Sequence, residues 1–500
     1  MRLRFRYSFL CLFLLGILPI TGYAQQSYTM NFLSQVPQQS KLNPAYYTCY
    51  KFYAGFPGLS GVQIQLNNDA LSYRRSFLPN DTGVDIRTSS IISNLAANNN
   101  FGFDISADIL SFGIKIKEKN QLHFGLSVEG YGNLLLTKNT FNLLLRGPGF
   151  FIGKDERGAL SGNSLDMSVY SAFSAGYARI INDKLSVGGR VKFLSGMANL
   201  YTERADISLH IDDGYDPNIV PYTYTLKPDV TLMGSFANSP QDSSLSAALR
   251  GIEQDIGRFI GLPRSLNHNP GIAFDLGLTY QVNDALTLAA AVRDIGFIRW
   301  NRGVKRVSSR GEEKPFEYSG VSDFVDMMND NGFSIRQALV AMKDSVIEYL
   351  QLDQVDSTFS SYRSKLRTSF NISAFYDLTD NDHLGLMWNM QINQQKGMAV
   401  TLAYTRTFGP NFSVCITNAI VNQNVINFGG GFVVKGGPIQ FYLIADKINA
   451  FQPANMRAFN LQFGLNVVLN RIDKDPTKRK FVRDYTPRDK TGYVRDRWAY

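Results

Sequence analysis

The stretch QLHFGLSVEGYGNLLL, residues 121–136, alternates apolar and polar side chains. One face carries Leu122, Phe124, Leu126, Val128 and Leu134, and the other carries His123, Ser127, Glu129 and Asn133. A period of two residues predicts a β-strand whose two faces meet different surroundings. The stretch is long enough to cross a bilayer at a tilt, which takes about 9 to 11 residues.

The same alternation recurs along the chain, in residues 185–193, 272–280, 384–392 and 459–469. After Ala24 no run of about 18 apolar residues occurs, so we expect no membrane-spanning helix. In lipid, a closed barrel is the other structure that pairs every backbone N–H and C=O group. The sequence therefore predicts an all-β fold, a transmembrane antiparallel β-barrel over residues 50–470.

The connections between these strands fall into two classes. Short turns rich in Asn, Asp and Gly, which tolerate the positive φ of tight hairpins, lie at residues 117–120, 182–183, 283–284, 379–382, 409–411 and 436–437. Long connections lie opposite them, at residues 68–101, 137–163, 200–269 and 300–361. This alternation predicts about fourteen strands, with the short turns in the periplasm and the long loops outside the cell.

Two of the long connections contain further patterns. Residues 201–211 and 222–232 are expected to pair as a hairpin that extends beyond the membrane. Residues 244–260 and 334–350 have helical spacing, which predicts short helices in the extracellular loops. Such helices either pack over the mouth of the barrel or form a lid that binds a substrate or partner.

The first residues predict export. Arg2, Arg4 and Arg6 form a basic region, residues 10–20 are apolar, and residues 22–24 offer the small side chains that a signal peptidase needs. We therefore expect residues 1–24 to be a signal peptide that is cleaved after Ala24. With a barrel downstream, the predicted location is the cell outer membrane.

Residues 25–49 precede the first strand and contain Asn43, Pro44 and Ala45. A lumen of about fourteen strands is wider than one that side chains fill and narrower than a porin channel. We expect this segment to plug the lumen as a hatch, with these three residues as the candidate hatch motif. The lumen is expected to hold few charges, and the candidate lumen residues are Glu129, Arg190, Asp275 and Arg293.

The charge of the chain is concentrated in residues 471–500. The whole sequence has a net charge of +9, and this tail contributes ten basic and five acidic residues. In an exported protein such a tail is a poor candidate for nucleic-acid binding. It either docks a periplasmic or envelope protein or anionic envelope material, or it is a solvated terminus.

Enzymatic function is not expected. The four histidines, at positions 123, 210, 268 and 383, have no spacing that would gather a metal ion, and no cofactor motif occurs. His123 and Ser127 share a strand face but are four residues apart, which is more than about 10 Å and too far for a nucleophile and its base. Residues 429–431, three glycines within a strand, indicate barrel curvature or close packing rather than a phosphate site.

Several stretches resemble a family of uncharacterised outer-membrane β-barrels of the Bacteroidota. They are Asn43-Pro44-Ala45, GGRVKFLSGMANL at residues 188–200, NPGIAFDLGLTYQVNDALTLAAAVRDIGFIRW at residues 269–300, and the alternating C-terminal strands. The likeness covers most of residues 28–470. That family is similar in layout to the FadL-type transporters of long-chain fatty acids, which pair a fourteen-stranded barrel with an N-terminal hatch. A shorter likeness around Asn-Pro-Ala points to the PorP/SprF barrels of type IX secretion.

Together these features predict passive, FadL-like transport of small apolar molecules across the outer membrane. The alternative is a structural or secretion-associated barrel that docks other proteins and transports nothing. The expected partners are outer-membrane lipid, a hydrophobic small-molecule ligand, and a periplasmic or envelope protein at the basic tail. No cofactor and no nucleic acid are expected.

Overall fold

The computed structural model describes residues 28–68, 71–80, 83–117, 119–153, 160–216, 220–236, 269–315, 350–356, 361–393, 397–421, 427–448 and 457–471. The predicted signal peptide and the predicted helix at 244–260 lie outside these residues, as do the basic tail after Arg471 and all of the helix at 334–350 except Leu350. No helix among the described residues has the length and apolar character to cross a membrane.

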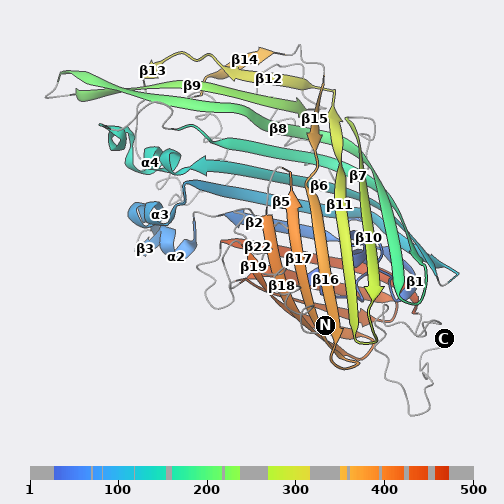
Figure 1. Cartoon of the computed structure of the whole chain (residues 1–500). Helices are drawn as coiled ribbons and strands as arrows, with labels where there is room; N and C mark the ends of the chain where they lie inside the picture. The colour runs from blue at the N-terminus through green and yellow to red at the C-terminus, as the bar shows by residue number, and fades with distance from the viewer. Residues whose placement is uncertain are drawn as a thin grey trace, which may run out of the picture.

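Fourteen antiparallel strands close into a barrel (Figure 1). In barrel order they are β1 (Tyr50–Gly55) continued by β2 (Val62–Asn68), β5 (Asn98–Ile116), β6 (Asn120–Thr137), β7 (Ser164–Ile180), β8 (Leu185–Asp216), β10 (Pro270–Gln281), β11 (Leu286–Trp300), β15 (Tyr362–Lys365) continued by β16 (Thr368–Asp377), β17 (Asp382–Ile392), β18 (Gly397–Phe408), β19 (Phe412–Val421), β20 (Phe428–Gly436), β21 (Ile439–Ile448) and β22 (Ala458–Arg471). The ring closes because β22 pairs with β1 and β2, as in Val62↔Phe463. The predicted fold class is confirmed.

The strands meet at the short turns that the sequence predicts. For example, β7 ends at Ile180 and β8 begins at Leu185, and β10 ends at Gln281 and β11 begins at Leu286. We call this end of the barrel the turn end and the opposite end, with the long connections, the loop end. Asn182 and Asn283 close their turns by accepting backbone hydrogen bonds at 2.8–2.9 Å through their side-chain oxygens. These turns fix the register of the hairpins that they connect.

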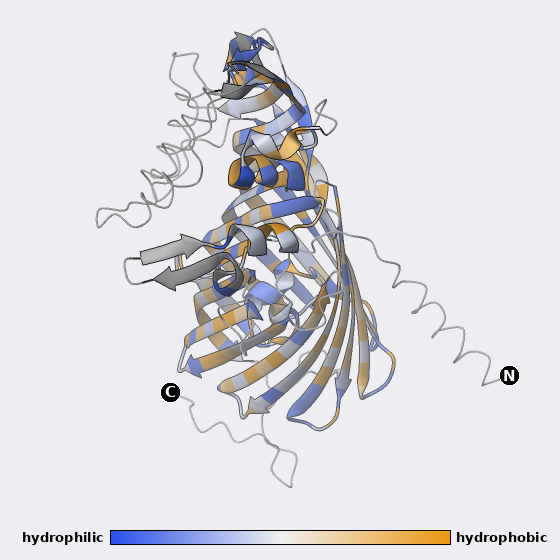
Figure 2. Cartoon of the chain, turned by 90° about the vertical axis from the view of Figure 1, so that its left-hand side faces the viewer, coloured by the Kyte–Doolittle hydropathy of each residue, from blue (hydrophilic) through white to orange (hydrophobic). Residues whose placement is uncertain are grey.

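The two faces of each strand differ as the alternation predicts. On β10, the outward Leu276 is 58% exposed, whereas the inward Asp275 is fully buried. Figure 2 shows hydrophobic and hydrophilic residues alternating along the barrel strands. The outward side is therefore an apolar surface, and the polar side chains lie inside.

At the loop end, β8 continues past the barrel and pairs with β9 (Val220–Phe236). The predicted hairpin is confirmed, with Ile207 opposite Pro228. The short strands β12 (Val304–Ser309), β13 (Lys314–Pro315) and β14 (Leu352–Asp356) extend this sheet (Figure 1). An apolar cluster holds this extension together: Ala198, Leu200, Val230, Leu232, Val307 and Leu352.

The described helices lie in the connections 68–101 and 137–163. They are α2 (Tyr73–Ser76) and α3 (Thr88–Asn94), and α4 (Lys138–Arg146), with the hairpin β3 (Phe77–Asn80)–β4 (Gly83–Ile86) between α2 and α3 and the 3-10 turn η3 (Pro148–Phe151) after α4. Thr137 caps α4 by accepting a hydrogen bond from the Thr140 backbone N–H, and Gly147 ends it with a φ of 80°. Ile91 and Ile92 of α3 pack with Phe141 of α4. These helices were not predicted from the sequence. Each is short, and the apolar residues of α3 and α4 pack against each other, which a local pattern does not reveal.

The largest apolar core of the described residues lies inside the barrel, around residues 28–49. This N-terminal segment contains two 3-10 turns, η1 (Thr29–Phe32) and η2 (Pro37–Lys41), and nearly all of its residues are buried. Phe32, Leu33 and Val36 pack against inward-facing residues of the far strands, including Ala399, Ala403, Met387 and Val433. The lumen is therefore filled by the chain itself on this side.

Candidate functional site

Asn43 links the N-terminal segment to the barrel wall. Its side-chain amide N–H groups donate to the carbonyl oxygens of Leu278 on β10 and Ala290 on β11, both at 3.2 Å. Its Oδ1 accepts a hydrogen bond from the Ala45 backbone N–H at 2.9 Å. One side chain thus holds its own loop in shape and fastens that loop to two adjacent strands.

Two glycines make room for this loop. Gly188 on β8 and Gly277 on β10 are paired directly across the sheet. A β-carbon at position 277 would overlap the Asn43 Oδ1, and one at position 188 would overlap the Pro44 carbonyl. We call this pair the glycine notch. It explains why Asn43-Pro44-Ala45 can lie against strand backbone, which any side chain would prevent.

The beginning of the segment is fastened to the opposite wall. Asp446 on β21 accepts hydrogen bonds from the backbone N–H groups of Tyr28 and Thr29, at 3.1 and 3.3 Å. The Thr29 hydroxyl also lies 2.8 Å from the Thr417 hydroxyl of β19. A β-carbon at Gly429 would collide with Asp446 and Thr417, so of the two roles predicted for the three glycines the contacts favour close packing.

The middle of the segment is bound as well. The Gln38 amide donates to the Ser60 carbonyl at 2.8 Å and to Asn466 at 2.6 Å. Arg190 of β8 donates to the Ser40 carbonyl at 3.0 Å. Because its anchors come from walls on several sides, the segment is suspended across the lumen rather than laid along one strand.

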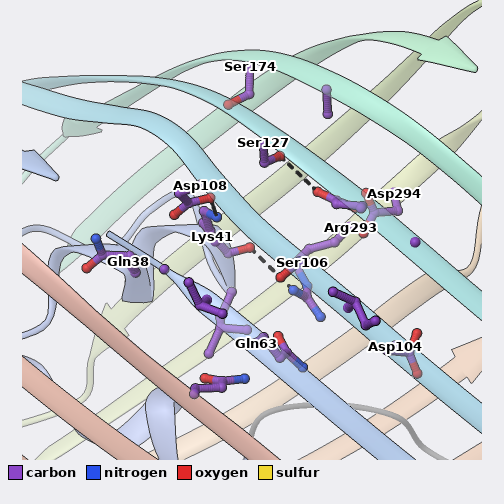
Figure 3. Close-up of a pocket in the computed structure, with 18 of the residues that line it drawn as sticks. Gln38, Lys41, Gln63, Asp104, Ser106, Asp108, Ser127, Ser174, Arg293 and Asp294 are labelled. Carbon is purple, nitrogen blue, oxygen red and sulfur yellow. Dashed lines mark hydrogen bonds and ion pairs between the residues drawn. The ribbon is translucent and has the colours of Figure 1, made fainter. Parts of the chain in front are cut away.

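A cavity of about 210 Å³ lies between this segment and the wall (Figure 3). Its lining is strongly charged, with five basic and four acidic side chains: Lys41, Arg190, Lys192, Arg293, Arg367, Asp104, Asp108, Glu129 and Asp294. The prediction of a lumen with few charges is therefore wrong. The sequence argument sampled only some of the inward positions, and barrel closure brings the rest together.

Most of these charges form ion pairs. Lys41 of the N-terminal segment contacts Asp108 of β5, and Arg367, between β15 and β16, contacts Asp104 of β5. Lys192 of β8 lies 2.6 Å from Asp294 and 3.0 Å from Asp275. Pairing of this kind offsets much of the cost of removing charges from bulk water.

A β-bulge on β11 adds one of these charges. Asp275 of β10 lies opposite both Arg293 and Asp294, and Asp294 has a φ of 59°. In a regular strand adjacent side chains point to opposite faces, but here Arg293 and Asp294 both line the cavity. Alternation alone would have placed Asp294 outside, so no local signal identified it.

The four lumen residues proposed from the sequence lie as follows. Glu129, Arg190 and Arg293 line the cavity, and the Tyr170 hydroxyl donates to Glu129 at 2.9 Å. Asp275 is fully buried behind the cavity, where it accepts from the Asp294 backbone N–H at 2.8 Å. Sequence reasoning missed Asp104, Asp108 and Arg367, whose partners are distant in the chain.

On its loop-end side the cavity meets an aromatic cluster. The Arg367 guanidinium lies over the Tyr131 ring, 3.9 Å from its centre, and Tyr170 packs in the same cluster. The Trp300 indole N–H donates to the Ser364 hydroxyl at 2.7 Å. The cavity is thus bounded by the N-terminal segment on one side and by Arg367 with these aromatic rings on the other.

A second hollow, of about 480 Å³, is mostly apolar. It lies on the outward face of neighbouring strands toward the loop end, where Leu66 and Leu134 are 46% and 37% exposed. Its lining also includes Phe101, Phe103, Leu165, Met167, Arg457 and Phe459. Gly132 deepens it, since a β-carbon there would overlap the Phe103 ring.

One known family matches most of the chain. A model described as "Family of unknown function (DUF5723)" matches residues 44–446. The chain belongs to the DUF5723 family. No curated protein matches this DUF5723 member.

Several solved structures are similar to this DUF5723 protein. The Ralstonia pickettii toluene transporter TbuX has 11% identity and a TM-score of 0.38, over 86% of this chain and 92% of that chain. A Pseudomonas aeruginosa FadL homologue has 10% identity and a TM-score of 0.41, over 89% and 99%. The P. putida toluene transporter TodX has 9% identity and a TM-score of 0.36, over 87% and 93%.

Proposed function

We propose that this DUF5723 protein is an outer-membrane barrel through which small molecules pass when an N-terminal hatch, residues 25–49, moves. The closed ladder and the apolar outward surface support the location, since a barrel pairs all its backbone groups within lipid. In this proposal residues 1–24 are the signal peptide, residues 50–470 the barrel and residues 471–500 a periplasmic tail. In this proposal the passage of solutes is passive.

The observation that carries the proposal is the way the hatch is fastened. Its Asn43 end is held by two hydrogen bonds to strand carbonyls and by shape against the glycine notch. A net hydrogen bond contributes about 1 kcal/mol, so release of this end costs far less than unfolding the barrel. A hatch held in this manner can shift while the wall stays closed.

The charges of the cavity bear on the class of cargo. The prediction of apolar cargo assumed a lumen with few charges, and the charged cavity removes that support. Apolar cargo stays a prediction, but the apolar hollow beside Leu66, Phe103 and Phe459 lies on the outward face of the strands and not in the lumen. The charged cavity inside the barrel offers such cargo no favourable contact.

A second candidate function is docking of another envelope protein. The extension of β8, β9, β12 and β14 favours it, because this sheet projects from the barrel and serves no purpose in closing it (Figure 1). Recovery of an envelope protein at fixed stoichiometry with the purified barrel would favour docking. Recovery of a bound small molecule would favour transport.

The decisive experiment deletes residues 26–49 and compares single-channel currents in planar bilayers. The barrel should still fold, because its ladder does not need the hatch. Conductance should rise, because the freed lumen admits water and ions. Equal, low conductance of the full-length and shortened proteins would refute the gating role of Asn43, Pro44 and Ala45.

A further inference from the structure

We propose that the charged cavity binds a small dipolar solute, one that carries both a cationic and an anionic group, and that the Arg367–Asp104 ion pair is the contact this solute opens. The inference rests on the proposed transport function and specifies its cargo. It concerns the loop-end boundary of the cavity, which the hatch does not form.

The pair joins distant parts of the wall. Asp104 lies on β5 and Arg367 at the junction of β15 and β16, and β6, β7, β8, β10 and β11 lie between them in barrel order. The contact therefore crosses the lumen instead of bridging neighbouring strands. Breaking it widens the passage without removing any bond from the strand ladder.

The Arg367–Asp104 pair lies nearer the loop end than the contact between Lys41 and Asp108. Asp104 is four residues nearer the loop end of β5 than Asp108, which contacts Lys41 of the hatch. At about 3.3 Å per residue the two carboxylates are about 13 Å apart along the strand. The cavity is thus enclosed between two ion pairs, one at the hatch and one at Arg367.

Both partners are accessible from the cavity but largely removed from bulk water. The exposed fraction of the side chain is 17% for Asp104 and 14% for Arg367. The Oδ2 atom of Asp104 is buried and has no hydrogen-bond partner among the described residues, so it can accept a hydrogen bond once the ion pair opens. Each group nevertheless needs an opposite charge, because an unpaired buried charge is strongly destabilising.

This requirement selects the solute. A dipolar solute offers an anionic group to Arg367 and a cationic group to Asp104, so both buried charges stay paired when the Arg367–Asp104 contact opens. A simple anion leaves Asp104 unpaired, and a simple cation leaves Arg367 unpaired. An apolar solute leaves both unpaired and also displaces water from the other charges of the cavity.

The experiment measures solute entry into liposomes that contain the full-length protein. Matched probes of similar size are alanine as the dipolar solute, lactate as the anion, isopropylamine as the cation and 1,2-propanediol as the neutral solute. We expect alanine to enter about tenfold faster than either ion and to saturate. Binding is measured separately, as a shift in the thermal unfolding of the barrel with each probe.

Removing one charge of the pair should change which charged probe enters faster. Asp104→Asn leaves Arg367 as the unmatched charge and should shift preference toward lactate. Arg367→Met leaves Asp104 and should shift preference toward isopropylamine, and the double variant should lose the preference. The control is Arg204→Met with Asp229→Asn, which removes an ion pair on the extension whose side chains are 59% and 57% exposed.

The outcomes separate this inference from the proposed function. If hatch deletion raises conductance but the four probes enter at equal rates and none shifts unfolding, the dipolar site is refuted and transport stands. If toluene alone stabilises the barrel, the cargo is apolar and the inference fails. If alanine shifts unfolding but hatch deletion leaves conductance unchanged, the site stands and the hatch gate fails. Heat-modifiable gel migration verifies that each variant is folded.

Discussion

Gly277 lies directly beneath Asn43, so closely that a β-carbon at position 277 would occupy the space of the Asn43 Oδ1. The same amide reaches past this glycine to the carbonyl of the next residue, Leu278. At this contact the wall and the N-terminal segment fit closely, through Gly277 on one side and Asn43 on the other. Either residue can be altered to test whether this contact closes the lumen.

Replacing Gly277 with valine should push the Asn43 loop off the wall. We expect a folded barrel whose single-channel conductance rises toward that of the hatch deletion, because strands tolerate valine well and only the hatch must yield. Gly436→Val is the control, since no atom lies within 4 Å of a β-carbon there. Unchanged conductance in Gly277→Val would mean that the loop has room to adjust.

Replacing Asn43 with alanine removes two hydrogen bonds to strand carbonyls. At about 1 kcal/mol each, this loss should make the released hatch about thirtyfold more populated. Hydrogen exchange of residues 28–49 should accelerate by a similar factor, while exchange in β17 and β18 stays unchanged as an internal reference. Equal acceleration throughout would indicate general destabilisation instead.

Two leucines of similar exposure should respond differently to arginine. Leu276 on β10 is 58% exposed and Leu144 on α4 is 50% exposed. If β10 faces lipid, Leu276→Arg should cost about 2 to 4 kcal/mol of folding free energy, and Leu144→Arg should change it by less than about 0.5 kcal/mol. Urea unfolding in lipid vesicles measures both. Equal tolerance would place Leu276 in water and remove the membrane assignment.

The mature protein should begin at Gln25. Intact mass spectrometry of protein taken from outer membranes tests this, because cleavage after Ala24 removes residues 1–24. Ala24→Arg serves as the matched variant, since a bulky charged residue at the cleavage site should block processing. Retention of Met1 in the unaltered protein would contradict export by a cleaved signal.

The strands, the turns and the two faces of each strand could be predicted from the sequence alone. Alternation in residues 121–136 and 272–280, together with Asn182 and Asn283 in the turns, depends on neighbours within a few residues, so it is readable without the fold. Because short turns and long connections alternate along the chain, the number of strands could be predicted as well. The faces of Leu276 and Asp275 were assigned correctly for the same reason.

The chemistry of the lumen was decided only by the tertiary structure. Asp294 enters the cavity because a bulge shifts the alternation of β11, and a bulge depends on pairing with β10. Asp104 and Arg367 are 263 residues apart and meet only when the ring closes. Asn43 was found in the sequence, but its notch needs Gly188 and Gly277 on two different strands. Local patterns follow from backbone geometry, whereas the pairing of buried charges depends on which walls face each other, and barrel closure alone sets that.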